Sequence, residues 1–168
     1  YYTALGLLVV TGMRISEVTS LKRQDVNLEN GLLLIRESKF KNTRAIPLHG
    51  TTVGVLSEYA RLRDELFPGV TCDAFFLADG GGALSKPAME TMFVRISHRI
   101  GLRKPNQSFG PRIHDFRHTF AVNTLTRWYR EGADVERRLP ILSAYLGHVK
   151  PSDTYWYLSA VPELVGLV

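Results

Sequence analysis

The sequence contains only one cysteine, Cys72, among its 168 residues. A lone cysteine excludes an internal disulfide and any zinc site built on several thiolates, and it is typical of a reducing compartment. The longest apolar run, residues 4–10, is far shorter than the roughly 20 residues that span a bilayer. We therefore expect a cytoplasmic protein with neither a membrane span nor a signal peptide.

The sequence also lacks the glycine patterns that bind nucleotides. The run Gly80-Gly81-Gly82 is surrounded by neither G-x-x-x-x-G-K-[ST] nor G-x-G-x-x-G. The glycine run therefore does not indicate a phosphate loop of the ATPase or dinucleotide-binding type.

Acidic residues are outnumbered, with 16 Asp and Glu against 21 Lys and Arg, a net charge of +5 and a pI near 9.5. This excess favours an anionic partner. The composition, 45% hydrophobic and 22% charged, is ordinary for a globular domain with its own core. Because the chain begins at Tyr1 within a helical pattern, we expect it to be a fragment of a longer protein.

Hydrophobic patterns and turn residues predict an α+β chain that is mainly helical. Two strands, at 32–35 and 44–48, should form a small antiparallel sheet near the N-terminal third. The hairpin tip between them carries Lys39 and Lys41, and segment 25–31 should be a turn-rich link.

The helices are expected to end at glycine or proline, as at Gly12 and at Gly147, where the chain needs a left-handed cap. A break is expected over residues 128–133. The predicted helices cover residues 1–11, 15–21, 51–67, 86–100, 113–125, 134–146 and 151–158.

The most informative stretch is residues 113–118, because His114, Arg117 and His118 share one face of a helix start. The N-terminus of a helix carries partial positive charge and free N–H groups, so this turn is a natural seat for a phosphate. A zinc site on the two histidines, with Asp115 as acidic neighbour, is the alternative. The guanidinium between them opposes it. A solvated basic helix start is a third interpretation.

Two further positions stand out by their neighbours. Glu17 lies three residues after Arg14, close enough to pair with it and to hold its rotamer. His148 follows Gly147, the expected cap. Tyr155 and Tyr157 lie about 200° apart on a helix, so only one of them can face a site.

Four short motifs along the chain have the residues and spacing of a known enzyme family. They are T-G-M-R-I-S-E-V at 11–18, H-D-F-R-H-T-F-A at 114–121, Y-L-G-H at 145–148, and Tyr157 nine residues after His148. These resemble the arginine box, the H-x-x-R box, the L-G-H box and the nucleophile of the tyrosine recombinases, the phage integrase family. The resemblance covers nearly the whole chain.

The resemblance implies a site-specific recombinase or integrase that cleaves and rejoins DNA through a 3′-phosphotyrosyl intermediate, without metal, ATP or another cofactor. Arg14 and Arg117 would take the negative charge of the phosphate. His148 would donate a further hydrogen bond, and His114 would assist proton movement at Tyr157, the nucleophile.

A lysine on the strand hairpin would protonate the leaving oxygen. Lys39 lies five residues before Arg44, which is the family spacing, but the family's K-x-G-K-x-R glycine is missing. Lys41 therefore stays open as the acid, as Tyr155 does as a reserve nucleophile. The catalytic residues that the resemblance implies are Arg14, Lys39, His114, Arg117, His148 and Tyr157.

The resemblance further implies that residues 1–168 form an integrase-like catalytic domain and that a separate N-terminal core-binding domain lies outside them. The expected partner is double-stranded DNA, bound by a homotetramer on paired recombination sites and associated with the nucleoid. A strand transferase of the type IB topoisomerase or telomere resolvase kind is an alternative. So is a DNA-binding module without catalysis.

Overall fold

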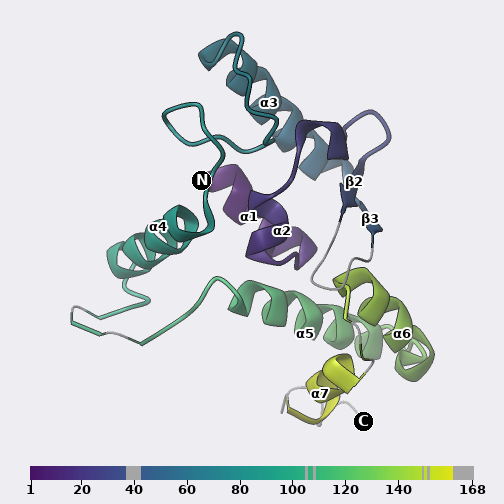
Figure 1. The fold of residues 1–168 in the computed structure, drawn as a ribbon. Coiled ribbons are helices and arrows are strands. Elements are labelled where there is room, and N and C mark those ends of the chain that lie inside the picture. The colour runs from purple at the N-terminus through teal and green to yellow at the C-terminus, as the bar shows by residue number, and fades with distance from the viewer. Residues whose placement is uncertain (37–42, 105, 108, 149, 151, 161–168) are drawn as a thin grey trace.

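The computed structural model describes residues 1–36, 43–104, 106–107, 109–148, 150 and 152–160. Helices make up most of the described chain, and a small antiparallel sheet lies in its N-terminal third (Figure 1). The predicted α+β, mainly helical class is confirmed. The elements are α1 (Tyr2–Thr11), α2 (Ile15–Thr19), the 3-10 helix η1 (Arg23–Asp25), β1 (Val26–Asn27), β2 (Leu32–Ile35), β3 (Arg44–Pro47), α3 (Gly50–Leu66), α4 (Lys86–Arg99), α5 (Asp115–Arg130), α6 (Val135–Leu146) and α7 (Ser152–Ala160).

The sheet has the order β1-β2-β3, and both strand pairs are antiparallel. The two predicted strands are β2 and β3, with Leu33 opposite Ile46 in the buried register. Strand β1 lies in the segment predicted as a turn-rich link. It is only two residues long, too short to show alternation, and it is defined by its pairing of Val26 with Leu33.

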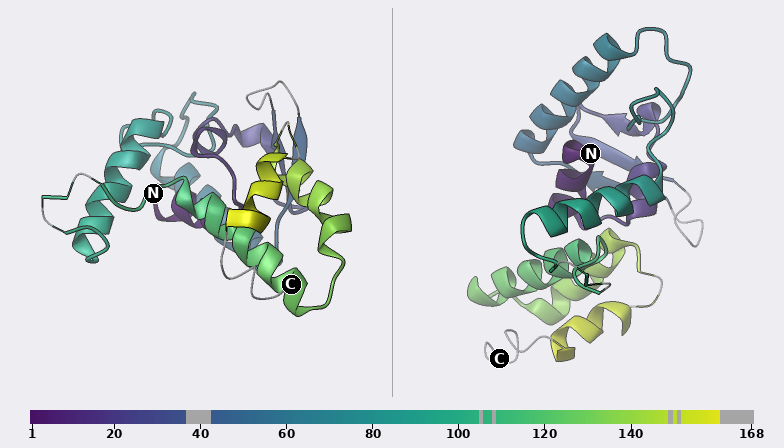
Figure 2. Two further views of the ribbon diagram at one scale, coloured as in Figure 1. Left: turned by 90° about the horizontal axis from the view of Figure 1, so that it is seen from below. Right: turned by 90° about the vertical axis from the view of Figure 1, so that its left-hand side faces the viewer.

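In the part of the chain that the structure describes, the hydrophobic core consists of two clusters. The first joins α1 and α2 to the sheet, α3 and α4, and the second joins α5, α6 and α7. Figure 2 (right) shows the elements of the first cluster above those of the second. Tyr145 of α6 packs against both clusters, and α1 contacts α5 between them. The two halves therefore meet where α1 ends.

Gly12 closes α1 and brings it against α5. Its φ of 62° is left-handed, and its N–H donates to the Leu8 carbonyl, as the predicted cap requires. A Cβ at this position would lie 2.6 Å from Cδ1 of Phe120 on α5. Only glycine fits both demands, and the sharp turn sets Arg14 at the start of α2.

Helix α5 is longer than predicted, since it continues to Arg130 into the expected break at 128–133, and only residues 131–133 of that break are non-helical. Trp128, Tyr129 and Arg130 include no glycine or proline, so nothing local stops the helix there. The chain turns only at Gly132, with φ of 66°. Among the described residues, no helix is long and apolar enough to cross a membrane.

Candidate active site

Most of the predicted site residues line one polar groove of about 650 Å³. They come from the α1–α2 junction, the start of α5, the residue after the α6 cap, and α7. Lys39 and Lys41 lie outside the described residues. The groove is lined by Arg14, Arg112, His114, Arg117, His118, His148, Asp153, Trp156 and Tyr157.

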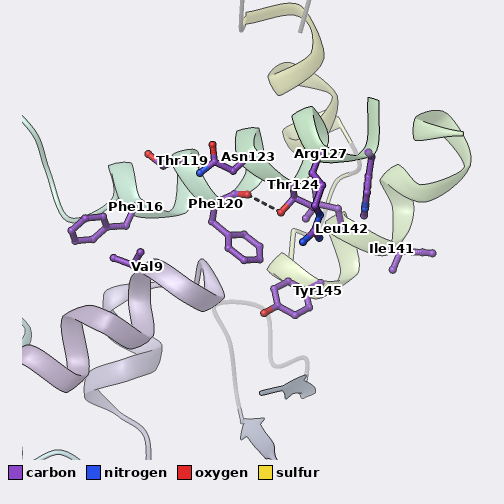
Figure 3. Close-up of a pocket in the computed structure, with 11 residues that line it drawn as sticks. Val9, Phe116, Thr119, Phe120, Asn123, Thr124, Arg127, Ile141, Leu142 and Tyr145 are labelled. Carbon is purple, nitrogen blue, oxygen red and sulfur yellow. Dashed lines mark hydrogen bonds between the residues drawn. The ribbon is translucent and has the colours of Figure 1, made fainter. Parts of the chain in front are cut away.

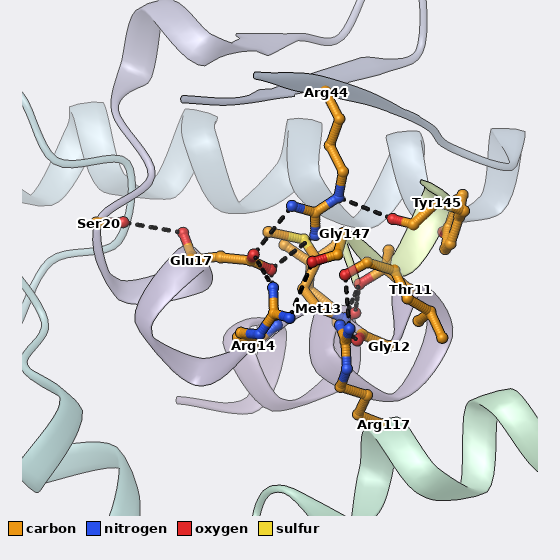
Figure 4. A network of polar contacts seen from close by, with 12 residues as sticks. Thr11, Gly12, Met13, Arg14, Glu17, Ser20, Arg44, Arg117, Tyr145 and Gly147 are labelled. Atoms are coloured by element: carbon orange, nitrogen blue, oxygen red, sulfur yellow. Dashed lines mark hydrogen bonds and ion pairs between the residues drawn. The ribbon is translucent and has the colours of Figure 1, made fainter. Parts of the chain in front are cut away.

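The C-terminal end of α6 organises this groove. The last carbonyls of a helix have no partner within the helix and carry partial negative charge. Here three consecutive carbonyls each accept a hydrogen bond from a different arginine (Figure 4). Arg44 of β3 donates to Tyr145 at 2.8 Å, Arg117 of α5 to Leu146 at 2.6 Å, and Arg14 to Gly147 at 3.0 Å.

Arg14 is the N-cap residue of α2 and pairs with Glu17, as predicted. Its backbone N–H donates to Oε2 at 2.8 Å and its Nη1 to Oε1 at 3.1 Å. Together with the bond to Gly147, these contacts fix the guanidinium at the groove wall. The rotamer of Arg14 is therefore set before any ligand arrives.

Glu17 is shared by a second arginine that the sequence did not single out as functional. Arg44 forks onto its carboxylate, with Nη1 at 3.0 Å from Oε1 and Nη2 at 2.8 Å from Oε2. Burial alone would raise the pKa of Glu17, but the hydrogen bonds from Arg44 and from the Arg14 backbone outweigh it and lower that pKa. Glu17 is thus an anion that holds two cations.

Arg44 also explains why a glycine precedes His148. Gly147 has a left-handed φ of 70°, and a Cβ there would lie 2.8 Å from Nη1 of Arg44. The predicted cap is confirmed, since the backbone N–H of His148 donates to the Ser143 carbonyl at 3.0 Å. The sequence signals for Arg44 were its place at the start of a strand after the lysine hairpin and its position five residues after Lys39, at the arginine of the K-x-G-K-x-R pattern.

Arg117 is 2% exposed and spans the two halves of the fold. Its Nη1 donates to the Gly12 carbonyl at 2.9 Å, while its Nη2 reaches Leu146. Burial, followed by repulsion from Arg14, lowers the pKa of Arg117 to about 10. It therefore remains a cation at neutral pH. A guanidinium carries five N–H donors, so two carbonyl bonds leave capacity for an anion.

His148 is held by α7 as well as by the cap. Its Nδ1 lies 2.7 Å from Oγ1 of the fully buried Thr154. Burial, followed by repulsion from Arg117 and Arg14, lowers the pKa of His148 to about 4. The ring is therefore neutral at pH 7. In the tautomer whose Nδ1 accepts from the Thr154 hydroxyl, Nε2 carries the proton that can be donated in the groove.

Helix α7 turns Tyr157 into the groove and Tyr155 away from it. Tyr157 is 3% exposed and lines the groove, whereas Tyr155 is 48% exposed. The Tyr157 hydroxyl lies 2.9 Å from Nδ1 of His118. Burial raises the pKa of Tyr157, although Arg117 and Arg14 act against it, so the hydroxyl is protonated at rest.

His114 lies just before α5, and its ring meets that of His118 edge-on, with centroids 4.8 Å apart. The two imidazoles thus share a face, as the spacing predicts. The sequence placed His118 on the face expected to bind a phosphate, or alternatively as a zinc ligand, and did not predict its contact with the tyrosine. Among the described residues, no group of three His, Cys, Asp or Glu could hold a metal ion.

A second, apolar groove of about 460 Å³ opens on another face of α5, between that helix, α1 and α6 (Figure 3). Val9 lies at its α1 side, and Phe120 stacks on Tyr145 with ring centroids 5.6 Å apart. It shares no residue with the polar groove.

Comparison with known proteins places the chain in a family. The chain matches the Phage integrase family over residues 1–163. It is 43% identical over 166 residues to the protein named "Putative integrase/recombinase y4rB" of Sinorhizobium fredii, covering 98% of this chain and 53% of the relative. It is 33% identical over 157 residues to the tyrosine recombinase XerD of Staphylococcus epidermidis, covering 92% and 48%.

Solved structures agree in fold. The XerA recombinase superposes with a TM-score of 0.78 at 24% identity, covering 98% of this chain and 55% of that one. The XerH site-specific recombinase, in its post-cleavage complex with palindromic difH substrate, gives 0.72 at 27% identity, covering 97% and 43%. The chain spans about half the length of the relatives it matches. It belongs to the phage integrase family.

Proposed function

We propose that residues 1–168 form the catalytic domain of a site-specific DNA recombinase that cuts and rejoins strands through a 3′-phosphotyrosyl intermediate. The observation that carries the proposal is the convergence of two arginines, His148 and the Tyr157 hydroxyl on one groove. A phosphodiester held there would meet fixed cations on one side and a nucleophile on the other.

The proposed chemistry is an in-line attack by Tyr157 on a backbone phosphate. Negative charge grows on the non-bridging oxygens, and Arg14 and Arg117 would stabilise it with charge-assisted hydrogen bonds. His148 would donate one more. His114 would assist proton movement at the tyrosine. Because the guanidiniums are already fixed by carbonyls, little reorganisation is needed when the charge develops.

The leaving group is a 5′ oxygen of deoxyribose, which needs a proton as it departs. By its place in the motif, Lys39 would supply this proton, with Lys41 as the alternative. The phosphotyrosine would conserve the energy of the broken bond, so rejoining would need neither ATP nor metal.

The proposed partner is double-stranded DNA, supported by the net charge of +5 and by the DNA substrate bound to XerH in its solved complex. We propose a homotetramer on paired recombination sites as the working assembly. The expected location is the cytoplasm, on the nucleoid when bound to DNA.

A covalent trapping assay tests the function. The probe is a pool of duplexes with randomised sequence around a fixed nick, so that the short 5′-hydroxyl fragment diffuses away after cleavage and the adduct accumulates. The protein should form an SDS-resistant adduct in the presence of EDTA. Tyr157→Phe should abolish it, whereas the matched control Tyr155→Phe should retain it.

Three outcomes would contradict the proposal. DNA binding without any adduct would favour a non-catalytic module. An adduct that survives Tyr157→Phe would place the nucleophile elsewhere. Strand cleavage lost on chelation would favour a metal-dependent hydrolase on His114 and His118.

A further inference from the structure

The hydrogen bond between Tyr157 and His118 connects α7 to the start of α5. Nδ1 lies 2.9 Å from the hydroxyl oxygen, and the two rings are 5.6 Å apart at 56°. The His118 ring also meets His114 at 4.8 Å and Trp156 at 6.0 Å between centroids. Three rings thus fix the imidazole with one nitrogen directed at the phenol.

We propose that His118 is a further catalytic residue, the group that takes the phenolic proton of Tyr157 when the tyrosine attacks DNA. This rests on the proposed function. It assigns to His118 the step that the motif alone would give to His114. The residues concerned are adjacent in space but four apart in the chain, and only the tertiary structure distinguishes them.

The O–H bond of Tyr157 breaks, and its proton moves to Nδ1 of His118, which becomes an imidazolium. The freed electron pair forms the bond from the phenolic oxygen to phosphorus. The bond from phosphorus to the 5′ oxygen breaks, and that oxygen takes a proton from the general acid. In rejoining, His118 returns its proton to the departing tyrosine, so no proton is gained or lost overall.

Geometry favours His118 over His114 for this step. Among the described residues, His118 supplies the side chain that forms a hydrogen bond with the Tyr157 hydroxyl, and the phenol donates to Nδ1 when that nitrogen is unprotonated. His114 packs edge-on against the His118 ring at an interplanar angle of 85°. It supports the orientation of its neighbour and remains at the groove surface, where a phosphate would lie.

The electrostatics suit a proton acceptor. Burial, the largest cause, lowers the pKa of His118, as do Arg112 and Arg117, so the resting ring is neutral and Nδ1 can accept. Asp115 acts in the other direction and would stabilise the imidazolium once it forms. The titratable and charged groups around His118 are Arg112, His114, Asp115 and Arg117 near the start of α5, Arg14 before α2, His148 after α6, and Asp153 and Tyr157 on α7.

The test compares two variants of His118 in the adduct assay, under single turnover and across pH. In His118→Asn, the side-chain oxygen can still accept the phenolic hydrogen bond at the Nδ1 position but takes no proton near neutral pH. His118→Ala removes both abilities. We expect both to slow adduct formation by about 100-fold, as loss of a general base does. Added imidazole should restore part of the rate to His118→Ala.

A substrate with sulfur at the 5′ bridging position distinguishes the loss of the general base from the loss of the general acid. A thiolate leaves without protonation, so variants of the general acid, Lys39→Ala or Lys41→Ala, should recover on this substrate. His118→Asn should stay slow, because the attacking hydroxyl still has to lose its proton. A role in positioning alone would predict near-normal rates for His118→Asn on both substrates.

A measurement on the unsubstituted protein tests the inference even if the His118 variants fail to fold. The pKa of the His118 ring, followed by NMR, should coincide with the midpoint at which adduct formation falls at low pH. A mismatch would overturn the inference. So would a normal rate for His118→Asn while the unsubstituted protein forms its adduct at Tyr157, and that result would leave the proposed function standing. If the unsubstituted protein forms no adduct, both fail.

Discussion

Two grooves open on different faces of α5, and they differ in what holds their walls in place. The apolar groove depends on side-chain packing, as in the stacking of Phe120 on Tyr145. The polar groove depends on directed hydrogen bonds, because Arg14 and Arg117 are each tied to a carbonyl at the end of α6. Packing tolerates changes of similar volume, whereas a guanidinium fork has few substitutes. Substitutions on the face of α5 that lines the polar groove should therefore reduce the rate of catalysis. Substitutions on the face that lines the apolar groove should leave that rate nearly unchanged.

The largest expected effect comes from Arg117. Arg117→Ala should reduce the rate of adduct formation by about 10²–10³-fold, because one donor to the developing phosphate charge is lost. Arg117→Lys should not recover this rate, since a single ammonium cannot replace the fork to the Gly12 and Leu146 carbonyls.

The control for this prediction lies on the other face of the same helix. Asn123 lines the apolar groove. Because it lies away from the expected phosphate, Asn123→Ala should change the rate of adduct formation by less than about twofold. Single-turnover adduct assays measure both. If Asn123→Ala were as damaging as Arg117→Ala, the division between the two grooves would be wrong.

The next effect is on stability and concerns Arg44. Arg44→Ala leaves the buried Glu17 carboxylate without its fork and the Tyr145 carbonyl without its donor. We expect the free energy of unfolding to fall by about 3 kcal/mol. Urea denaturation measures it.

A double variant checks the cause. If Glu17 and Arg44 act as a pair, Glu17→Gln with Arg44→Ala should cost less than the sum of the single changes. Strict additivity would show that Arg44 acts through its carbonyl contact alone.

The smallest effect is a pH dependence. The pKa of Glu17 is lowered in the folded state from its ordinary 4.5. Its charge therefore contributes stability above that value, and the contribution is lost as pH falls below it. The stability difference between the unsubstituted protein and Glu17→Gln should narrow as the pH falls from above 4.5 to below it. A difference that stays constant over this range in urea denaturation would contradict the lowered pKa.

Local patterns sufficed for much of the fold. The apolar run of α1, its Gly12 cap and the Gly147 cap of α6 were predictable, because helix periodicity and glycine's backbone freedom act within a few residues. The end of α5 at Arg130 and the existence of β1 were not predictable from local patterns. The first has no local stop signal before Gly132, and the second depends on pairing with β2.

Short motifs, each a contiguous stretch of the chain, were enough to predict Arg14, His114, Arg117, His148 and Tyr157 as residues of one site. How these side chains are held follows from the folded structure. Arg44 reaches Glu17 and Tyr145 across 27 and 101 residues, and His118 reaches Tyr157 across 39. Contacts at such separations leave no local pattern, because they arise only when folding brings the end of α6 to β3, α5 and the α1–α2 junction, and α7 to the start of α5.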